Sequence, residues 1–132
     1  MQPDATSRAD KGKSGWRRVW NASRYSWAGL QAAWQHEQAF RQEVYLAAIL
    51  LPLSFWCASN GVELALLMGS VLLVMICELI NSALEAVVDR ISLDTHPLSK
   101  RAKDLGSAVV TLALLGMVIV WACVLSHGRL FS

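Results

Sequence analysis

The feature that most constrains the fold of this chain is a segment of 22 residues, 105–126, without a charged side chain. A helix of about 20 apolar residues crosses the hydrocarbon core of a bilayer, so this segment meets the requirement by itself. Two further apolar segments, 44–59 and 62–88, precede it in a chain of only 132 residues, and 55% of all residues are hydrophobic. Soluble domains have roughly 45–50%. The sequence therefore predicts an all-α integral membrane protein with three transmembrane helices.

These segments set the boundaries of the expected helices. We expect spans at about 40–59, 62–88 and 105–126, with Pro52 as a candidate kink in the first. Residues 1–15 contain scattered charge and no apolar run, which predicts a flexible tail. Residues 16–132 are expected to form a single membrane domain. The three cysteines lie inside apolar stretches without CxxC spacing, so we expect them to pack as small hydrophobic residues.

An amphipathic segment at about 16–38 precedes the first span. Its four tryptophans, Trp16, Trp20, Trp27 and Trp34, are spaced by four, seven and seven residues, which places them on one stripe of a helix. The arginines of this segment supply the polar side chains of the amphipathic helix. We therefore expect a helix that lies in the membrane interface, with Gly29 as a candidate break.

Basic residues are distributed unevenly between the two sides of the expected spans. Of the twelve Lys and Arg, seven lie at or before Arg41 and four lie in the expected loop from Arg90 to Lys103, whereas the link around Asn60 has none. The positive-inside rule then places the N-terminus and the loop at 90–103 in the cytoplasm and the C-terminus outside.

Four polar residues stand on one face of the second span. Glu78, Asn81, Glu85 and Asp89 are separated by three, four and four residues, within one arc of a helix. Carboxylates at membrane depth are costly and usually mark function. A span of 20 residues from Val62 ends near Asn81, so this face passes from the hydrocarbon into the cytoplasmic interface.

The position of each carboxylate suggests a different role. Glu78 and Glu85 are about 10 Å apart along the helix axis, too far to share one small cation. Glu78, in the more apolar setting, suits a general base, and Glu85, nearer water, suits a divalent ion. The following loop adds a mixed-charge cluster that could hold phosphates or set membrane topology. Its members are Asp94, His96, Lys100, Arg101, Lys103 and Asp104.

Two other interpretations of the acidic face stay open from the residues alone. Its side chains could hold an oligomer together by hydrogen bonds, or they could line the pore of a small membrane channel or subunit. The outer half of the second span offers only Glu63 before an unbroken apolar run, which disfavours a continuous polar path. The pattern around Glu37 by itself favours a solvated helix face.

The twelve residues from Glu78 to Asp89, ELINSALEAVVD, carry a specific resemblance. They are similar to the signature of the small prokaryotic diacylglycerol kinases, acidic-x-x-Asn-Ser-x-x-Glu followed by Val-Asp. The stretches AFRQE at 39–43 and RAKDLGSA at 101–108 support the resemblance, which covers about residues 16–127. The loop from Asp94 to Lys100 is less similar than its surroundings.

This resemblance implies a reaction and a set of site residues. It implies transfer of phosphate from ATP with Mg²⁺ to the primary hydroxyl of 1,2-diacylglycerol, by a homotrimer with shared active sites in the bacterial inner membrane, and no nucleic acid partner. Glu78 would be the general base with Asn81 and Asp89 beside it, and Glu37 and Glu85 would hold the metal. A related branch phosphorylates undecaprenol, which is the alternative substrate.

The contacts that the resemblance implies fall into two sets. The nucleotide contacts are Arg18, Tyr25, Glu37, Glu85, Asp94, Thr95, His96, Lys103 and Asp104. The lipid contacts are Arg18, Ala22, Ser23, Arg24, Tyr25, Ser26, Trp27, Gln31, Ala32, Ala33, Trp34, Ala39, Phe40, Arg41, Gln42, Glu43, Trp56, Cys57, Ala58, Ser59, Leu64, Glu78 and Ser107.

Overall fold

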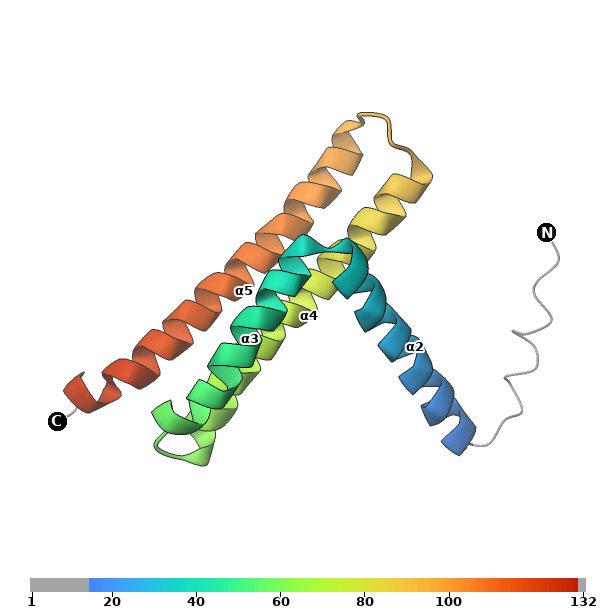
Figure 1. Ribbon diagram of the computed structural model, residues 1–132. Helices are drawn as coiled ribbons and strands as arrows, with labels where there is room; N and C mark the ends of the chain where they lie inside the picture. The colour runs from blue at the N-terminus through green and yellow to red at the C-terminus, as the bar shows by residue number, and fades with distance from the viewer. Residues whose placement is uncertain (1–14, 131–132) are drawn as a thin grey trace. The chain divides into compact units, whose positions relative to one another are not determined.

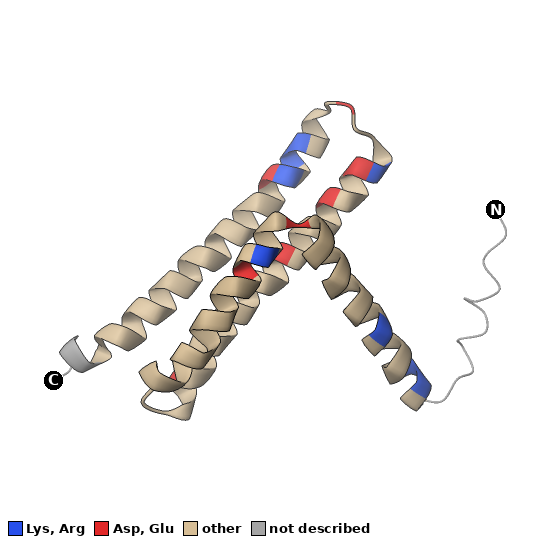
Figure 2. Ribbon diagram, in the orientation of Figure 1, with Lys and Arg blue, Asp and Glu red and all other residues tan. Residues whose placement is uncertain are grey.

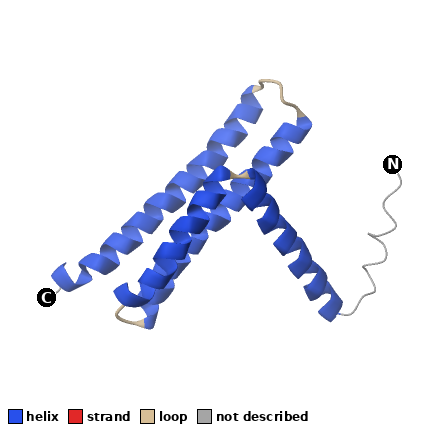
Figure 3. Ribbon diagram, in the orientation of Figure 1, coloured by secondary structure: helices blue, strands red, loops and turns tan. Residues whose placement is uncertain are grey.

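The protein is all-helical in the part of the chain that the structure describes (Figures 1 and 3). This computed structural model describes residues 15–130, with side chains for 15–127. Its helices are α2 (Gly15–His36), α3 (Gln38–Cys57), α4 (Gly61–Ile91) and α5 (Pro97–Leu130). The all-α prediction is confirmed. The tail predicted at 1–15 lies outside the described residues, except for Gly15.

The helices are divided between two compact units, and the boundary along the chain falls between His36 and Glu37. Helix α2 belongs to the first unit and corresponds to the surface helix predicted at 16–38. It continues through Gly29, so the break expected there does not occur. One glycine costs a helix interior only about 1 kcal/mol, and its neighbours here are compatible with a helix. The four tryptophans of the predicted stripe are exposed, as an interfacial helix requires.

Helices α4 and α5 are long and apolar enough to cross a membrane. Only 22% of the most apolar window of α4 and 6% of that of α5 are buried, so most of their apolar side chains face outward. A core helix of a soluble protein would have this surface covered. Helix α3, the first expected span, falls short of the same criterion because Arg41, Gln42 and Glu43 occupy its first turns.

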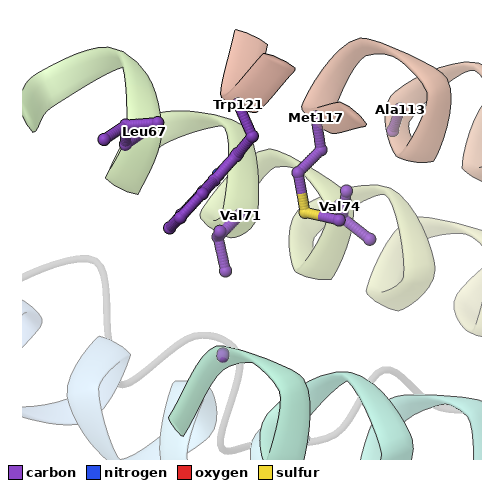
Figure 4. Packing of buried hydrophobic residues seen from close by; sticks show 7 residues of the cluster. Leu67, Val71, Val74, Ala113, Met117 and Trp121 are labelled. Atoms are coloured by element: carbon purple, nitrogen blue, oxygen red, sulfur yellow. The ribbon is translucent and has the colours of Figure 1, made fainter. Parts of the chain in front are cut away.

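In the second unit, α3 and α5 both pack against α4. The contact is formed by apolar side chains at helical spacing, with Leu67, Val71 and Val74 from α4 facing residues of the other two helices (Figure 4). The cluster also includes Ala47, Ala113, Met117 and Trp121. These residues hold the three helices in register through the apolar part of the unit.

Helix α4 is longer than its neighbour α3, with 31 residues against 20. At 1.5 Å per residue the difference is about 16 Å. Residues 58–60 join the end of α3 directly to the start of α4, so α3 begins opposite the middle of α4. Residues 92–96 join α4 directly to α5, so the last three turns of α4 continue beyond α3 beside α5. The polar face that begins at Glu78 starts at this level.

The connection between α4 and α5 is shorter than the loop expected at 90–103. It comprises residues 92–96, and α5 already begins at Pro97. Proline favours the first position of a helix because it has no N–H to leave unpaired. The His96 Nδ1 accepts a hydrogen bond from the Leu98 N–H at 3.1 Å and so caps the helix. Of the four basic residues expected in a loop, Arg90 therefore lies on the last turn of α4 and the other three lie on the first turns of α5.

Candidate active site

A buried carboxylate marks the centre of the candidate site. Glu78 of α4 is only 6% exposed. Three more carboxyl groups, those of Glu37, Glu43 and Glu85, lie within electrostatic range of it. Glu37 precedes the first residue of α3 in extended backbone, so the start of α3 opposite the middle of α4 brings it to Glu78. The structure thus joins three of the predicted catalytic and metal-binding residues.

Two buried oxygens beside this cluster have no hydrogen-bond partner among the described residues. They are Oε2 of Glu43 and Oδ1 of Asn81. The Asn81 Nδ2 donates to the Glu85 Oε1 at 3.4 Å, and its Oδ1 faces Gly106 of α5, where helix α5 approaches closely. Buried polar atoms are nearly always paired in proteins. Such atoms next to a carboxylate cluster are typical of a site that a ligand completes.

Charged residues of both signs meet where α4 ends and α5 begins (Figure 2). Lys103 forms an ion pair with Asp89 of α4 at 2.7 Å, and Lys100 forms one with Asp104 at 2.6 Å. These residues line a cavity of about 270 Å³. Its walls are Val88, Asp89, Ser92, Leu93, Asp94, Thr95, His96, Ser99, Lys100, Lys103 and Asp104. The cavity thus gathers five residues that were predicted to contact the nucleotide.

Other predicted contacts lie elsewhere in the described chain. The predicted lipid contacts 56–59 and Leu64 lie at the opposite end of α3 and α4 from Glu78, about 30 Å along α3 from its first residue. Ser107 is exposed on α5 next to Gly106. The residues predicted at 18–34 are on α2 in the separate first unit. On that helix Trp20, Arg24 and Trp27 line a shallow groove together with Ser23, Ala28 and Gln31.

Two further residues stand out in the structure, and sequence reasoning missed the second of them. Lys100 lines the same cavity as Lys103, whereas the sequence left its role open between phosphate binding and membrane topology. Its spacing of three residues from Lys103 would have placed both on one face once a helix start at Pro97 was accepted. Gly106 is buried against Asn81, and no local sequence pattern predicts that close approach of the two helices.

The carboxylates are compatible with a magnesium ion that arrives with a nucleotide. No cluster of three or more His, Cys, Asp or Glu side chains in residues 15–127 has the arrangement of a complete metal site. Mg²⁺ is usually bound by one or two carboxylates together with substrate phosphates and waters, so a complete protein cage is not required. Glu37 and Glu85 are half-buried and both lie near Glu78, and they fit this smaller donor set.

Comparison with known proteins agrees with this chemistry. Residues 24–125 match the family model of prokaryotic diacylglycerol kinase. The chain is 49% identical over 115 residues to a diacylglycerol kinase from Pseudomonas aeruginosa, covering 87% of this chain and 94% of that protein. It is 48% identical over 115 residues to the diacylglycerol kinase of Escherichia coli K12, with 86% and 94% covered. It is 51% identical over 105 residues to that of Haemophilus influenzae, with 80% and 89% covered.

The family match includes the carboxylate cluster around Glu78, both ion pairs of the cavity, all of α4 and α5 as far as residue 125. The relatives align over most of their own length as well as most of this chain. The chain therefore belongs to the prokaryotic diacylglycerol kinase family.

Proposed function

We propose that this membrane enzyme transfers the γ-phosphoryl group of ATP to the primary hydroxyl of 1,2-diacylglycerol. The hydroxyl oxygen forms a bond to the γ-phosphorus while the bond to the bridging oxygen of ADP breaks, which gives phosphatidic acid and ADP. The hydroxyl proton goes to a general base. Membership of the family supports the reaction, and the set of carboxylates around the buried Glu78 is the observation that carries its mechanism.

Glu78 is the general base in this proposal. Its carboxylate accepts the proton of the hydroxyl as the oxygen attacks phosphorus. Support comes from its burial and from its level on α4, near the end of the part that can lie in the hydrocarbon. A lipid hydroxyl at the membrane interface and a phosphate from the cytoplasm can both reach this level. Asn81 and Asp89, on the same face of α4, complete the polar surface on which the reactants are aligned.

Phosphoryl transfer depends mainly on positioning and on neutralising charge. Lys103 would neutralise phosphate charge, and Asp104 and the loop from Asp94 to His96 would contact the rest of the nucleotide, because all of them line one cavity. Glu37 and Glu85 would hold Mg²⁺. When bound, the ion supplies charge stabilisation to phosphate oxygens.

Membrane topology follows from the same arrangement. The Lys and Arg residues described on α4 and α5 lie where α4 ends and α5 begins (Figure 2), which supports a cytoplasmic position for the cavity and an external C-terminus. Helix α3 would cross the membrane together with α4 and α5, with Arg41 to Glu43 at the interface, and the amphipathic α2 would lie in the membrane interface. The enzyme then faces the cytoplasm from the bacterial inner membrane.

A homotrimer with shared active sites completes the proposal. Support comes from the outward-facing apolar surface of α4 and α5, which lipid or other copies of the chain must cover. Cross-linking of the purified protein in mixed micelles would establish the number of subunits.

The reaction is tested by following labelled phosphate from ATP into lipid. The purified chain in mixed micelles is offered diacylglycerol or undecaprenol at equal mole fraction. Labelling that depends on diacylglycerol is expected. Preferential labelling of undecaprenol would move the chain to the other branch of the family, and labelling of neither lipid by a correctly assembled protein would overturn the proposal.

A further inference from the structure

Two lysines of α5 point to one cavity, and the proposed mechanism uses only one of them. Lys100 and Lys103 are three residues apart, so they lie on the same face of the helix. Both line the cavity at the junction of α4 and α5, whereas their neighbour Arg101 does not. The cavity therefore has a second ammonium group with no part in the reaction as described.

Each lysine is held by a carboxylate in the structure. Lys103 pairs with Asp89 across the two helices, and Lys100 pairs with Asp104 along α5. The second pair is the more exposed, with side-chain exposures of 74% and 64% against 42% and 45%. Exposed ion pairs of this kind contribute little to stability, so Lys100 can change partner at small cost.

The charges of the cavity explain why a change of partner is needed. Its lining has three aspartates, Asp89, Asp94 and Asp104, and two lysines. With both lysines engaged by carboxylates, such a surface would repel a polyphosphate. A phosphate oxygen that takes Lys100 from Asp104 gains a charge-assisted hydrogen bond and leaves that carboxylate free to accept hydrogen bonds from hydroxyl or amino groups.

We propose that Lys100 is an additional phosphate-binding residue of the nucleotide site, which exchanges Asp104 for a phosphate oxygen when MgATP binds. This inference rests on the proposed function, because it assumes that the cavity receives the nucleotide. It extends that function by assigning both lysines of the cavity to the polyphosphate. Lys103 stays at the junction of the helices, and Lys100 contacts the phosphates from the side of the first turn of α5.

The test measures equilibrium binding of the non-hydrolysable Mg²⁺ complex of β,γ-imido-ATP to the full chain in mixed micelles by titration calorimetry. Lys100→Met is compared with Arg101→Met, which removes the same charge one residue away and outside the cavity. We expect Lys100→Met to weaken binding about tenfold, as expected for a lost charge-assisted hydrogen bond, and Arg101→Met to weaken it by less than about twofold. Lys100→Arg should restore most of the affinity, and all variants should keep the unfolding midpoint of the Arg101→Met control.

Several outcomes separate this inference from the proposed function. Equal affinities of Lys100→Met and Arg101→Met would overturn the role of Lys100, even if the wild type phosphorylates diacylglycerol. A selective loss of binding in Lys100→Met by a chain that phosphorylates neither lipid would refute the proposed reaction and support the nucleotide contact. A wild type that binds no nucleotide would overturn both.

Discussion

The close approach of α5 to α4 at Gly106 makes a sharp prediction for one added methyl group. A Cβ built at Gly106 would lie 2.1 Å from Oδ1 and 3.2 Å from Cγ of Asn81, more than 1 Å closer than ordinary van der Waals contact for the oxygen. Either the Asn81 side chain rotates away from Glu85, or the two helices move apart. In Gly106→Ala, therefore, both the packing of the unit and the polar face of the site are disturbed.

The size of the effect can be stated against a matched control. Gly116 is on the same helix, and a Cβ there meets nothing within 4 Å. Both Gly→Ala changes gain helix propensity, about 1 kcal/mol each, so the difference between them isolates the clash. Overpacking of this kind costs about 1–3 kcal/mol. We expect Gly106→Ala to be less stable than Gly116→Ala by that amount and to lose most of its kinase activity.

Two measurements check this prediction. Unfolding by sodium dodecyl sulfate in mixed micelles gives the difference in stability between the two variants, and incorporation of labelled phosphate gives the activity. The double variant Asn81→Ala/Gly106→Ala should be no less stable than Asn81→Ala, because the nearest remaining atom, Cδ2 of Leu84 at 3.7 Å, is in ordinary contact. Equal stability and activity of Gly106→Ala and Gly116→Ala would refute the account of this contact.

Two further predictions concern the metal and the fold. Glu85→Gln should raise the Mg²⁺ concentration required for half-maximal activity at least about tenfold, because a neutral amide binds a hard cation more weakly than a carboxylate does. Glu63→Gln, the same change at the other end of α4, should leave that requirement unchanged. An unaltered Mg²⁺ dependence in Glu85→Gln would show that Glu85 is not a metal ligand. Asn60→Ala should destabilise the chain by about 1 kcal/mol in the same unfolding assay, because its Oδ1 accepts the Glu63 N–H at 3.0 Å and caps α4; stability equal to that of the wild type would show that the cap contributes nothing.

The sequence predicted the elements of the fold more accurately than their ends. The uncharged stretch 105–126 and the apolar run after Val62 could be recognised without any structure, because bilayer thickness fixes the length of a spanning helix. The start of α5 was placed too late, since the charges from Lys100 to Asp104 suggested a loop although Pro97 favours a helix start. The candidate break at Gly29 does not occur, because the cost of a single glycine is too small to end a helix.

The candidate site was also only partly predictable from the sequence. The polar face of α4 could be predicted because its residues share one helix and one period. The approach of Glu37 and Glu43 to Glu78 could not, since it depends on how far α3 is displaced along α4, which no local pattern encodes. The role of Lys100 was left open and Gly106 was missed for the same reason. Their significance comes from neighbours on another helix or across a loop.

The measurement that tests the central claim most directly is the rate of a single turnover in Glu78→Gln. Enzyme in excess over labelled MgATP is mixed with diacylglycerol micelles, and phosphatidic acid is followed by rapid quenching, with nucleotide affinity and oligomeric state measured on the same sample. Glu63→Gln, on the same helix and far from the site, is the control. With Glu78 as general base, the rate of transfer should fall by about 10²–10⁴-fold while affinity and assembly stay those of the control. A transfer rate equal to that of Glu63→Gln would contradict the assignment, and loss of assembly in Glu78→Gln would make the residue structural.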